Sequence, residues 1–170
     1  MARIFVTADL HFGHANIIKY CNRPFSTTEE MDETLIKNWN QVVSKQDKVF
    51  IVGDFSFHDK EKTTEIISRL NGHKVLIYGN HDKSRNIQWW YEVGMNEVSK
   101  YTILYKEWLV LQHEPPTFIN DSTPYFYIYG HVHNTPTYKT LTNKSCCVSV
   151  ERWGYTPVDL DKINDLIKLL

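Results

Sequence analysis

Short hydrophobic runs recur along this chain, and segments with a longer apolar period lie between the first of them. Runs of four or five apolar residues bounded by polar turns are typical of buried β-strands, whereas apolar residues three and four positions apart indicate amphipathic helices. In the first half of the chain the two patterns alternate. We predict strands at 3–8, 48–52 and 74–78, a helix at 15–21, a helix that starts near 26–28 and ends near 45, a helix capped by Asp59 and closed by Asn71-Gly72, and a helix or irregular segment at 84–91.

The second half of the chain is mostly strand and loop. Its pattern predicts a hairpin from strands 101–105 and 108–111, a polar loop at 114–124, strands at 125–129 and 146–150 with a candidate strand at 137–141 between them, and a final helix capped by Asp159 or Asp161 and running through Leu170. Alternating strands and helices followed by consecutive strands favour two packed sheets with helices outside. The length suits a single domain over 1–170.

Charge and cysteine content narrow the function classes. With 19 basic and 20 acidic residues the net charge is −1, so no global field draws the protein to a membrane, and a nucleic-acid polymer is not an expected partner. The sequence shows neither a signal peptide nor an apolar run long enough to span a bilayer. Cys21, Cys146 and Cys147 are an odd number without metal-site or disulfide spacing, so we expect reduced thiols in a cytoplasmic protein.

Polar residues follow five of the hydrophobic runs directly. A lone Asp after a strand is more often a turn or cap residue, and a lone His is more often structural, so no single residue decides the matter. Because the carboxyl ends of parallel strands meet at one edge of a sheet, the ordered set predicts a metal site there. Its members are Asp9-Leu10-His11, Gly53-Asp54, Gly79-Asn80-His81-Asp82, His113 and Gly130-His131-Val132-His133.

The spacing of these residues suggests how they converge. Asp9 and His11 are two positions apart, as are His131 and His133, so in extended segments each pair points to one side. Glycines before Asp54 and Asn80 allow unusual backbone angles where the chain leaves a strand.

The residue types indicate which metals suit the site. The carboxylate of Asp54 can bridge two metals, and the Asn80 carbonyl adds a neutral oxygen. Mixed nitrogen and oxygen ligands suit Mn²⁺, Fe, Zn²⁺, Co²⁺ or Ni²⁺ better than Ca²⁺.

The motif set resembles the calcineurin-like metallophosphoesterase family, whose pattern is D-x-H, GD, GNHD, a strand-end H and GHxH. The resemblance implies a four-layer αββα sandwich of two mixed β-sheets flanked by helices, with two divalent transition-metal ions, manganese foremost. It implies that His81 is the catalytic histidine and that Asp82 orients it. It assigns Asp9, His11, Asp54 and His133 to one metal, and Asp54, Asn80, His113 and His131 to the other.

The stretch from Asp9 to Ile18, followed by Arg23-Pro24-Phe25, resembles a small bacterial and phage branch of that family. Two residues depart from the family pattern. Gln112 stands where a small residue often precedes the ligand His, and Glu151 stands where an Asp commonly follows the last strand. Neither is an expected ligand, so the departures concern substrate fit and local packing.

The resemblance implies attack of a metal-bridging hydroxide on a small phosphodiester or phosphomonoester, nucleotide-like molecules included. His81 could also protonate the leaving alkoxide. The alternatives are a catalytically silent protein-binding scaffold of the same fold and a metal-dependent nuclease. The presence of His81 and of every ligand position favours the enzyme, and the absence of a basic run argues against the nuclease. The oligomeric state stays open.

Three further residues are candidate substrate contacts, each with a structural alternative. His14 lies in a glycine-containing turn, Arg23 can bind phosphate through its fork, and His58 follows the Gly53-Asp54 turn. The loop at 114–124 is the predicted rim of the substrate site, because loops at ligand-binding ends set specificity.

Overall fold

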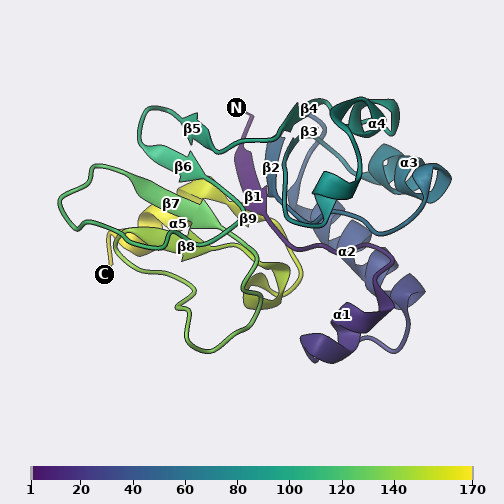
Figure 1. The fold of residues 1–170 in the computed structure, drawn as a ribbon, viewed down its shortest axis with the longest axis horizontal. Helices are drawn as coiled ribbons and strands as arrows, with labels where there is room; N and C mark the ends of the chain where they lie inside the picture. Colours follow the sequence, from purple (N-terminus) through teal and green to yellow (C-terminus); the bar gives the residue numbers. More distant parts are fainter. Residues whose placement is uncertain (1, 170) are drawn as a thin grey trace.

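Two mixed β-sheets pack face to face in the computed structural model, which describes residues 2–169 (Figure 1). In the first sheet the order is β4-β3-β2-β1-β9, with the first four parallel and β9 antiparallel to β1. In the second the order is β5-β6-β7-β8, with β5 antiparallel to β6 and the others parallel. The strands are β1 (Ile4–Thr7), β2 (Lys48–Val52), β3 (His73–Ile77), β4 (Glu97–Ser99), β5 (Ile103–Tyr105), β6 (Leu109–Leu111), β7 (Phe126–Tyr129), β8 (Ser145–Cys147) and β9 (Val158–Asp159).

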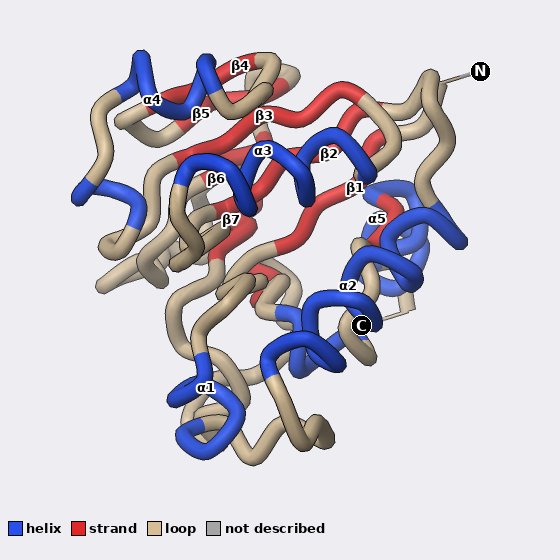
Figure 2. Tube along the Cα trace, turned by 90° about the vertical axis from the view of Figure 1, so that its right-hand side faces the viewer, coloured by secondary structure: helices blue, strands red, loops and turns tan. Residues whose placement is uncertain are grey.

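Within residues 2–169, five α-helices flank the sheets, in agreement with the predicted fold class. Helices α1 to α4 share one hydrophobic cluster with the outer face of the first sheet, and α3 lies in front of its strands in Figure 2. Helix α5 contacts β1 and β9. The helices are α1 (Ala15–Tyr20), α2 (Thr28–Val42), α3 (Lys60–Arg69), α4 (Ile87–Glu92) and α5 (Leu160–Ile167), with 3₁₀ turns η1 (Asp82–Ser84) and η2 (Val150–Trp153). No helix within residues 2–169 is both long and apolar enough to cross a membrane.

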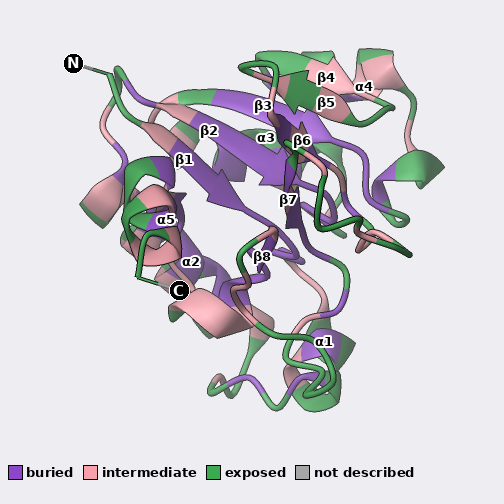
Figure 3. Ribbon diagram, turned by 90° about the vertical axis from the view of Figure 1, so that its left-hand side faces the viewer, coloured by how far each residue is buried: buried purple, intermediate pink, exposed green. Residues whose placement is uncertain are grey.

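The central strands are buried on both faces, which explains their unbroken hydrophobic runs. In β2, Val49 and Ile51 join the cluster under the helices, whereas Phe50 and Val52 join the cluster between the sheets. Strands β1 and β2 are accordingly buried in Figure 3. Burial of this kind supplies most of the driving force for folding and leaves only the strand ends open to solvent.

The observed elements differ from the predicted ones in four places. The predicted strand at 146–150 ends at Cys147, and Val150 begins η2. Strands β4 and β9 have three and two residues, too few for a recognisable pattern. The candidate strand at 137–141 does not form. The Arg152 guanidinium donates a hydrogen bond to the Tyr138 carbonyl at 2.9 Å, and Leu141 alone pairs, as an isolated bridge to Cys146. Helix α5 ends at Ile167, and Leu170 lies outside the described residues.

Backbone hydrogen bonds join the two sheets at the ends of their strands. Past β1, the Ala8 amide donates to Val148 and the Ala8 carbonyl accepts from Val150, at 3.0 and 3.1 Å. The Asp9 amide then donates to Gly53 at 3.0 Å. The polar turns that follow β1, β2 and β8 are thereby held against one another.

Candidate metal centre

The chain turns sharply where it leaves the strands. Five of the predicted ligands have positive φ angles: Asp9 59°, His11 53°, Asp54 57°, His131 70° and His133 47°. This left-handed conformation costs a side-chain-bearing residue roughly 1–2 kcal/mol and is concentrated at functional sites. The extended geometry predicted for the Asp9/His11 and His131/His133 pairs is therefore wrong, and left-handed turns carry these residues instead.

One group of donor atoms joins residues from both halves of the chain. Ligand atoms of Asp9, His11 and His133 all lie within 4.8 Å of one another. The Asp54 carboxylate borders this group, with Oδ2 3.5 Å from His11 Nε2. The structure thus brings together the four residues that the family resemblance assigned to one metal.

A second group of donor atoms lies beside the first. His113 Nε2 and His131 Nδ1 each lie 3.0 Å from Asn80 Oδ1, and the two nitrogens are 3.2 Å apart. Asp54 Oδ2 is 3.4 Å from His113 Nε2. The four residues predicted for the other metal therefore converge as well.

Two atoms of the first group have no hydrogen-bond partner within residues 2–169. They are Asp9 Oδ1 and His11 Nε2, and both are buried. A buried polar atom without a partner costs free energy, so such atoms are retained where something else satisfies them. Divalent transition metals fit this need, because carboxylate oxygen and imidazole nitrogen are their common ligands.

Hydrogen bonds behind the imidazoles aim their other nitrogens at the centre. His113 Nδ1 lies 2.9 Å from the Val52 carbonyl oxygen, and His133 Nδ1 lies 2.9 Å from the Glu151 carboxylate. Each contact requires a proton on Nδ1, so Nε2 is the nitrogen left to bind a metal. Metal-binding histidines are oriented in this way by carbonyl and carboxylate partners.

Burial and opposite charge set the protonation of the donors. Burial raises the pKa of Asp9 to about 6. Burial also opposes ionisation of Asp54, but the nearby imidazoles of His113 and His11 hold its pKa at about 2. Burial disfavours the His113 cation, yet the carboxylates of Asp54 and Asp9 raise its pKa to about 9. A metal ion bound here must therefore displace a proton from His113.

Glycine is required before two of the ligands for different reasons. Gly53 has φ +90°, and a Cβ atom there would lie 2.1 Å from His113 Nδ1. Gly79 lacks a positive φ, but a Cβ atom would lie 2.1 Å from Asp54 Oδ1. The predicted unusual backbone angle thus holds at Gly53, whereas Gly79 is needed for close approach.

His81 lies at the solvent edge of the centre. Its amide donates to Asp54 Oδ1 at 3.0 Å, and its half-exposed ring places Nε2 4.0 Å from Asp54 Oδ2. The buried Asp82 carboxylate accepts from the amides of Asp54, Gly79 and Phe55, at 2.7, 2.8 and 3.1 Å. Asp82 therefore holds the backbone that carries Asp54. An effect of Asp82 on the orientation of the His81 ring stays a prediction.

Arg23 is directed into the protein, so the predicted phosphate contact does not fit. Its guanidinium donates to the carbonyls of Asp9 and Leu10, at 2.7 and 3.0 Å, and to Glu151 at 2.6 Å. Glu151 Oε1 also contacts His133, so Glu151 belongs to the site, whereas the sequence had indicated it only as a departure from the family pattern. Its position directly after the predicted strand at 146–150 is the same signal that marked the other site residues.

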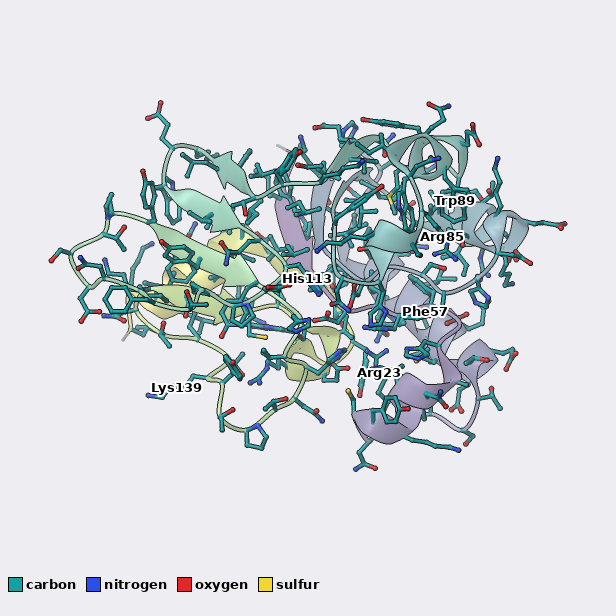
Figure 4. All side chains as sticks on the ribbon, in the orientation of Figure 1. Arg23, Phe57, Arg85, Trp89, His113 and Lys139 are labelled. Carbon is teal, nitrogen blue, oxygen red and sulfur yellow. The ribbon has the colours of Figure 1, made fainter. Side chains whose placement is uncertain are left out.

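The remaining two candidates make supporting contacts. His14 Nδ1 lies 3.1 Å from His11 Nδ1, and the His14 ring stacks on the half-exposed Phe57 at 4.0 Å. His58 Nε2 is 2.6 Å from Asp32, so this ring is paired within the protein. Figure 4 shows Arg23, Phe57 and His113 around the same central region. Substrate contact through His14 or His58 stays a prediction.

Two mixed sheets with nitrogen and oxygen donors gathered at their strand ends fit a metal-dependent phosphoester hydrolase. The chain belongs to the calcineurin-like phosphoesterase family, which it matches over residues 2–153.

Individual relatives extend the comparison. An uncharacterized protein of Methanocaldococcus jannaschii is 41% identical over 99% of this chain and 93% of its own length. The gene 66 protein of Mycobacterium phage L5 is 38% identical over 48% of this chain and 41% of its own. A crystal structure of an Aquifex aeolicus protein of unknown function superposes with a TM-score of 0.72, at 25% identity, over 98% of this chain and 100% of that one. The nuclease MPE of Pseudomonas putida shares the fold with a TM-score of 0.53, at 23% identity, over 77% of this chain and 62% of that one.

Proposed function

We propose that the protein hydrolyses a small phosphodiester or phosphomonoester, nucleotide-like molecules included, with two divalent metal ions. One observation carries the proposal: Asp54 Oδ2 lies 3.5 Å from His11 Nε2 and 3.4 Å from His113 Nε2. A carboxylate oxygen between two groups of donors suits the bridging of two cations. The ions would be held by Asp9, His11, Asp54 and His133, and by Asp54, Asn80, His113 and His131.

Two bound cations supply an activated water and offset negative charge on the phosphoryl oxygens. The chain contributes the proton chemistry through His81, whose half-exposed imidazole borders Asp54. An imidazole at this edge can donate a proton to the departing alkoxide, which matters most for a poor leaving group. This role favours diesters of ordinary alcohols, and Asp82 serves it indirectly by fixing the turn before His81.

Manganese is the metal we propose first, with iron, zinc, nickel or cobalt as alternatives. Imidazole, carboxylate and amide donors suit all of these ions, so geometry and supply decide among them. The three buried free cysteines suit a reducing compartment, and we propose that the enzyme acts in the cytoplasm. The donors span positions 9 to 133, so we also propose that residues 1–170 act as one domain.

The direct test is hydrolysis after loading the metal-stripped protein with Mn²⁺, Ni²⁺, Zn²⁺ or Mg²⁺. Bis-p-nitrophenyl phosphate and p-nitrophenyl phosphate are offered side by side. Faster turnover of the diester supports a phosphodiesterase, and the reverse preference identifies a phosphatase. Binding of two ions without turnover of either ester would favour the protein-binding scaffold.

Replacing His81 tests its catalytic role. We expect His81→Ala to lower kcat on the diester by roughly 10²–10⁴-fold, the usual contribution of general acid–base catalysis, with metal content unchanged. The matched control is His73→Ala, at an exposed histidine at the start of β3 that contacts Glu97. Equal turnover by the His81 and His73 variants would contradict the assignment.

A further inference from the structure

A cavity adjoins the metal centre where the chain crosses from the first sheet to the second. It holds about 240 Å³, and a neighbouring cavity of about 470 Å³ shares Tyr78, Lys83 and Lys100 with it. The larger volume falls within the range of about 300–1,000 Å³ typical of small-ligand sites, and the smaller one lies just below it. Asn80 and His113 form part of the wall of the smaller cavity. A ligand at the metal centre can therefore extend directly into it.

Two lysines give this cavity a local positive charge. Lys83 lies in η1 immediately after Asp82, and Lys100 follows β4, so separate elements bring them to one wall. The lysines that form ion pairs within residues 2–169 are others, which leaves both ammonium groups without a carboxylate partner there. Glu114 is the acidic residue among the lining groups. Two lysines without a carboxylate partner favour a ligand that carries a negatively charged group, such as a phosphate.

An aromatic ring stands beside the lysines. Tyr101 is 80% exposed, and its backbone is held by two hydrogen bonds with the Ser99 hydroxyl, at 2.7 and 3.1 Å. A fixed backbone and an open ring suit stacking against the face of a nucleobase. Gln112 also lines this cavity. The family often has a smaller residue at this position, so this departure from the family pattern lies where a substrate would bind.

We propose that this cavity is a subsite for a nucleotide unit attached to the scissile phosphoester. Lys83 and Lys100 would hold a second phosphate, and Tyr101 would stack on the neighbouring base. The inference rests on the proposed phosphodiesterase function and narrows its substrate to short, single-stranded nucleotide chains. The near-neutral net charge excluded a strong global field, but a pair of lysines at the site needs no such field.

The test compares a dinucleotide with and without a second phosphate. Thymidylyl-thymidine and its 5′- and 3′-phosphorylated forms are titrated into Mn²⁺-loaded His81→Ala protein by calorimetry, so that turnover does not interfere. We expect one phosphorylated form to bind roughly tenfold more tightly than the parent, and Lys83→Gln/Lys100→Gln to bring that ratio close to one. Which form is preferred reports the direction of the chain.

A matched control removes two other exposed lysines, by Lys37→Gln/Lys139→Gln, and should keep the tenfold ratio. Equal binding of all three dinucleotides, or a ratio that survives the loss of Lys83 and Lys100, would overturn the subsite. Turnover of bis-p-nitrophenyl phosphate by the unmodified enzyme tests the proposed function separately. Its failure would count against hydrolysis, and the binding ratio would still decide the subsite.

Discussion

At the scale of single residues, Glu151 connects the predicted metal ligands to the protein interior. One of its oxygens contacts both His133 Nδ1 and the Arg23 guanidinium, and the Arg23 side chain is fully buried. Burial opposes the charge of Glu151, but His133 and Arg23 hold its pKa below the usual value. The carboxylate therefore fixes the direction of a predicted ligand and neutralises a buried cation at once.

Replacing Glu151 by Gln should be costly because it leaves the buried Arg23 charge without a counterion. We expect a loss of about 3–5 kcal/mol in the free energy of unfolding. The matched control is Glu33→Gln, whose exposed pair with Arg69 is worth at most about 1 kcal/mol. Urea unfolding of both variants measures the difference. Similar losses in the free energy of unfolding would contradict a larger contribution of the buried pair to stability.

Metal binding should strengthen as pH rises. The pKa of His113 is raised to about 9 and that of His133 to about 10, so both rings hold a proton near neutral pH that a metal must displace. Below these values, affinity should rise up to about tenfold per pH unit for each proton displaced. Calorimetric titration with Mn²⁺ in buffers of different ionisation enthalpy should detect proton release. Affinity that stays constant from pH 6 to 8 would contradict these protonation states.

Without metal, these raised pKa values affect folding stability in the opposite direction, because the stability falls as pH rises. The folded-state pKa of His113 lies above the unfolded value of 6.5, so its protonation stabilises the folded chain. That contribution is complete below about pH 6.5 and is lost as pH rises through about 9.

At the scale of elements, the strand ends decide where chemistry occurs. The longer strands and helices were predictable because burial on one or both faces leaves a periodic pattern. The two- and three-residue strands β9 and β4 were not, because their pairing depends on neighbours distant in sequence. The donor residues were identifiable from their motifs, whereas their left-handed conformation was not. The inward direction of Arg23 likewise depends on Glu151, which lies 128 positions further along the chain.

Among the turn residues, Gly53 is the one whose substitution should tell most about the packing of the metal centre. Gly53→Ala combines a positive φ with a Cβ atom 2.1 Å from the His113 ring, so we expect loss of Mn²⁺ binding together with destabilisation. Gly154→Ala is the matched control, since it has φ +60° but open space around its Cβ position. The control should cost about 1–2 kcal/mol and keep the metal. Retained metal affinity in Gly53→Ala would contradict the packing of His113 against this turn.

At the scale of the whole molecule, the centre ties together both sheets. Its predicted ligands follow strands of each, so a bound ion would resist separation of the two layers. Anything that binds only the folded state stabilises it in proportion to the logarithm of ligand concentration over Kd. We expect chelation to lower Tm and an excess of Mn²⁺ to restore it. A Tm that does not change with metal concentration would contradict a site formed only by folding.

The pairing of Ala8 with residues 148–150 also has a consequence for synthesis. A ribosome makes Asp9 and His11 well before residues 148–150, the partners that close the site against them. A nascent chain therefore carries isolated donors with little affinity for any ion while most of the chain is still being translated. Metal acquisition would then follow synthesis of residues 148–150, and the cell's free metal pool at that moment would decide which ion the enzyme receives.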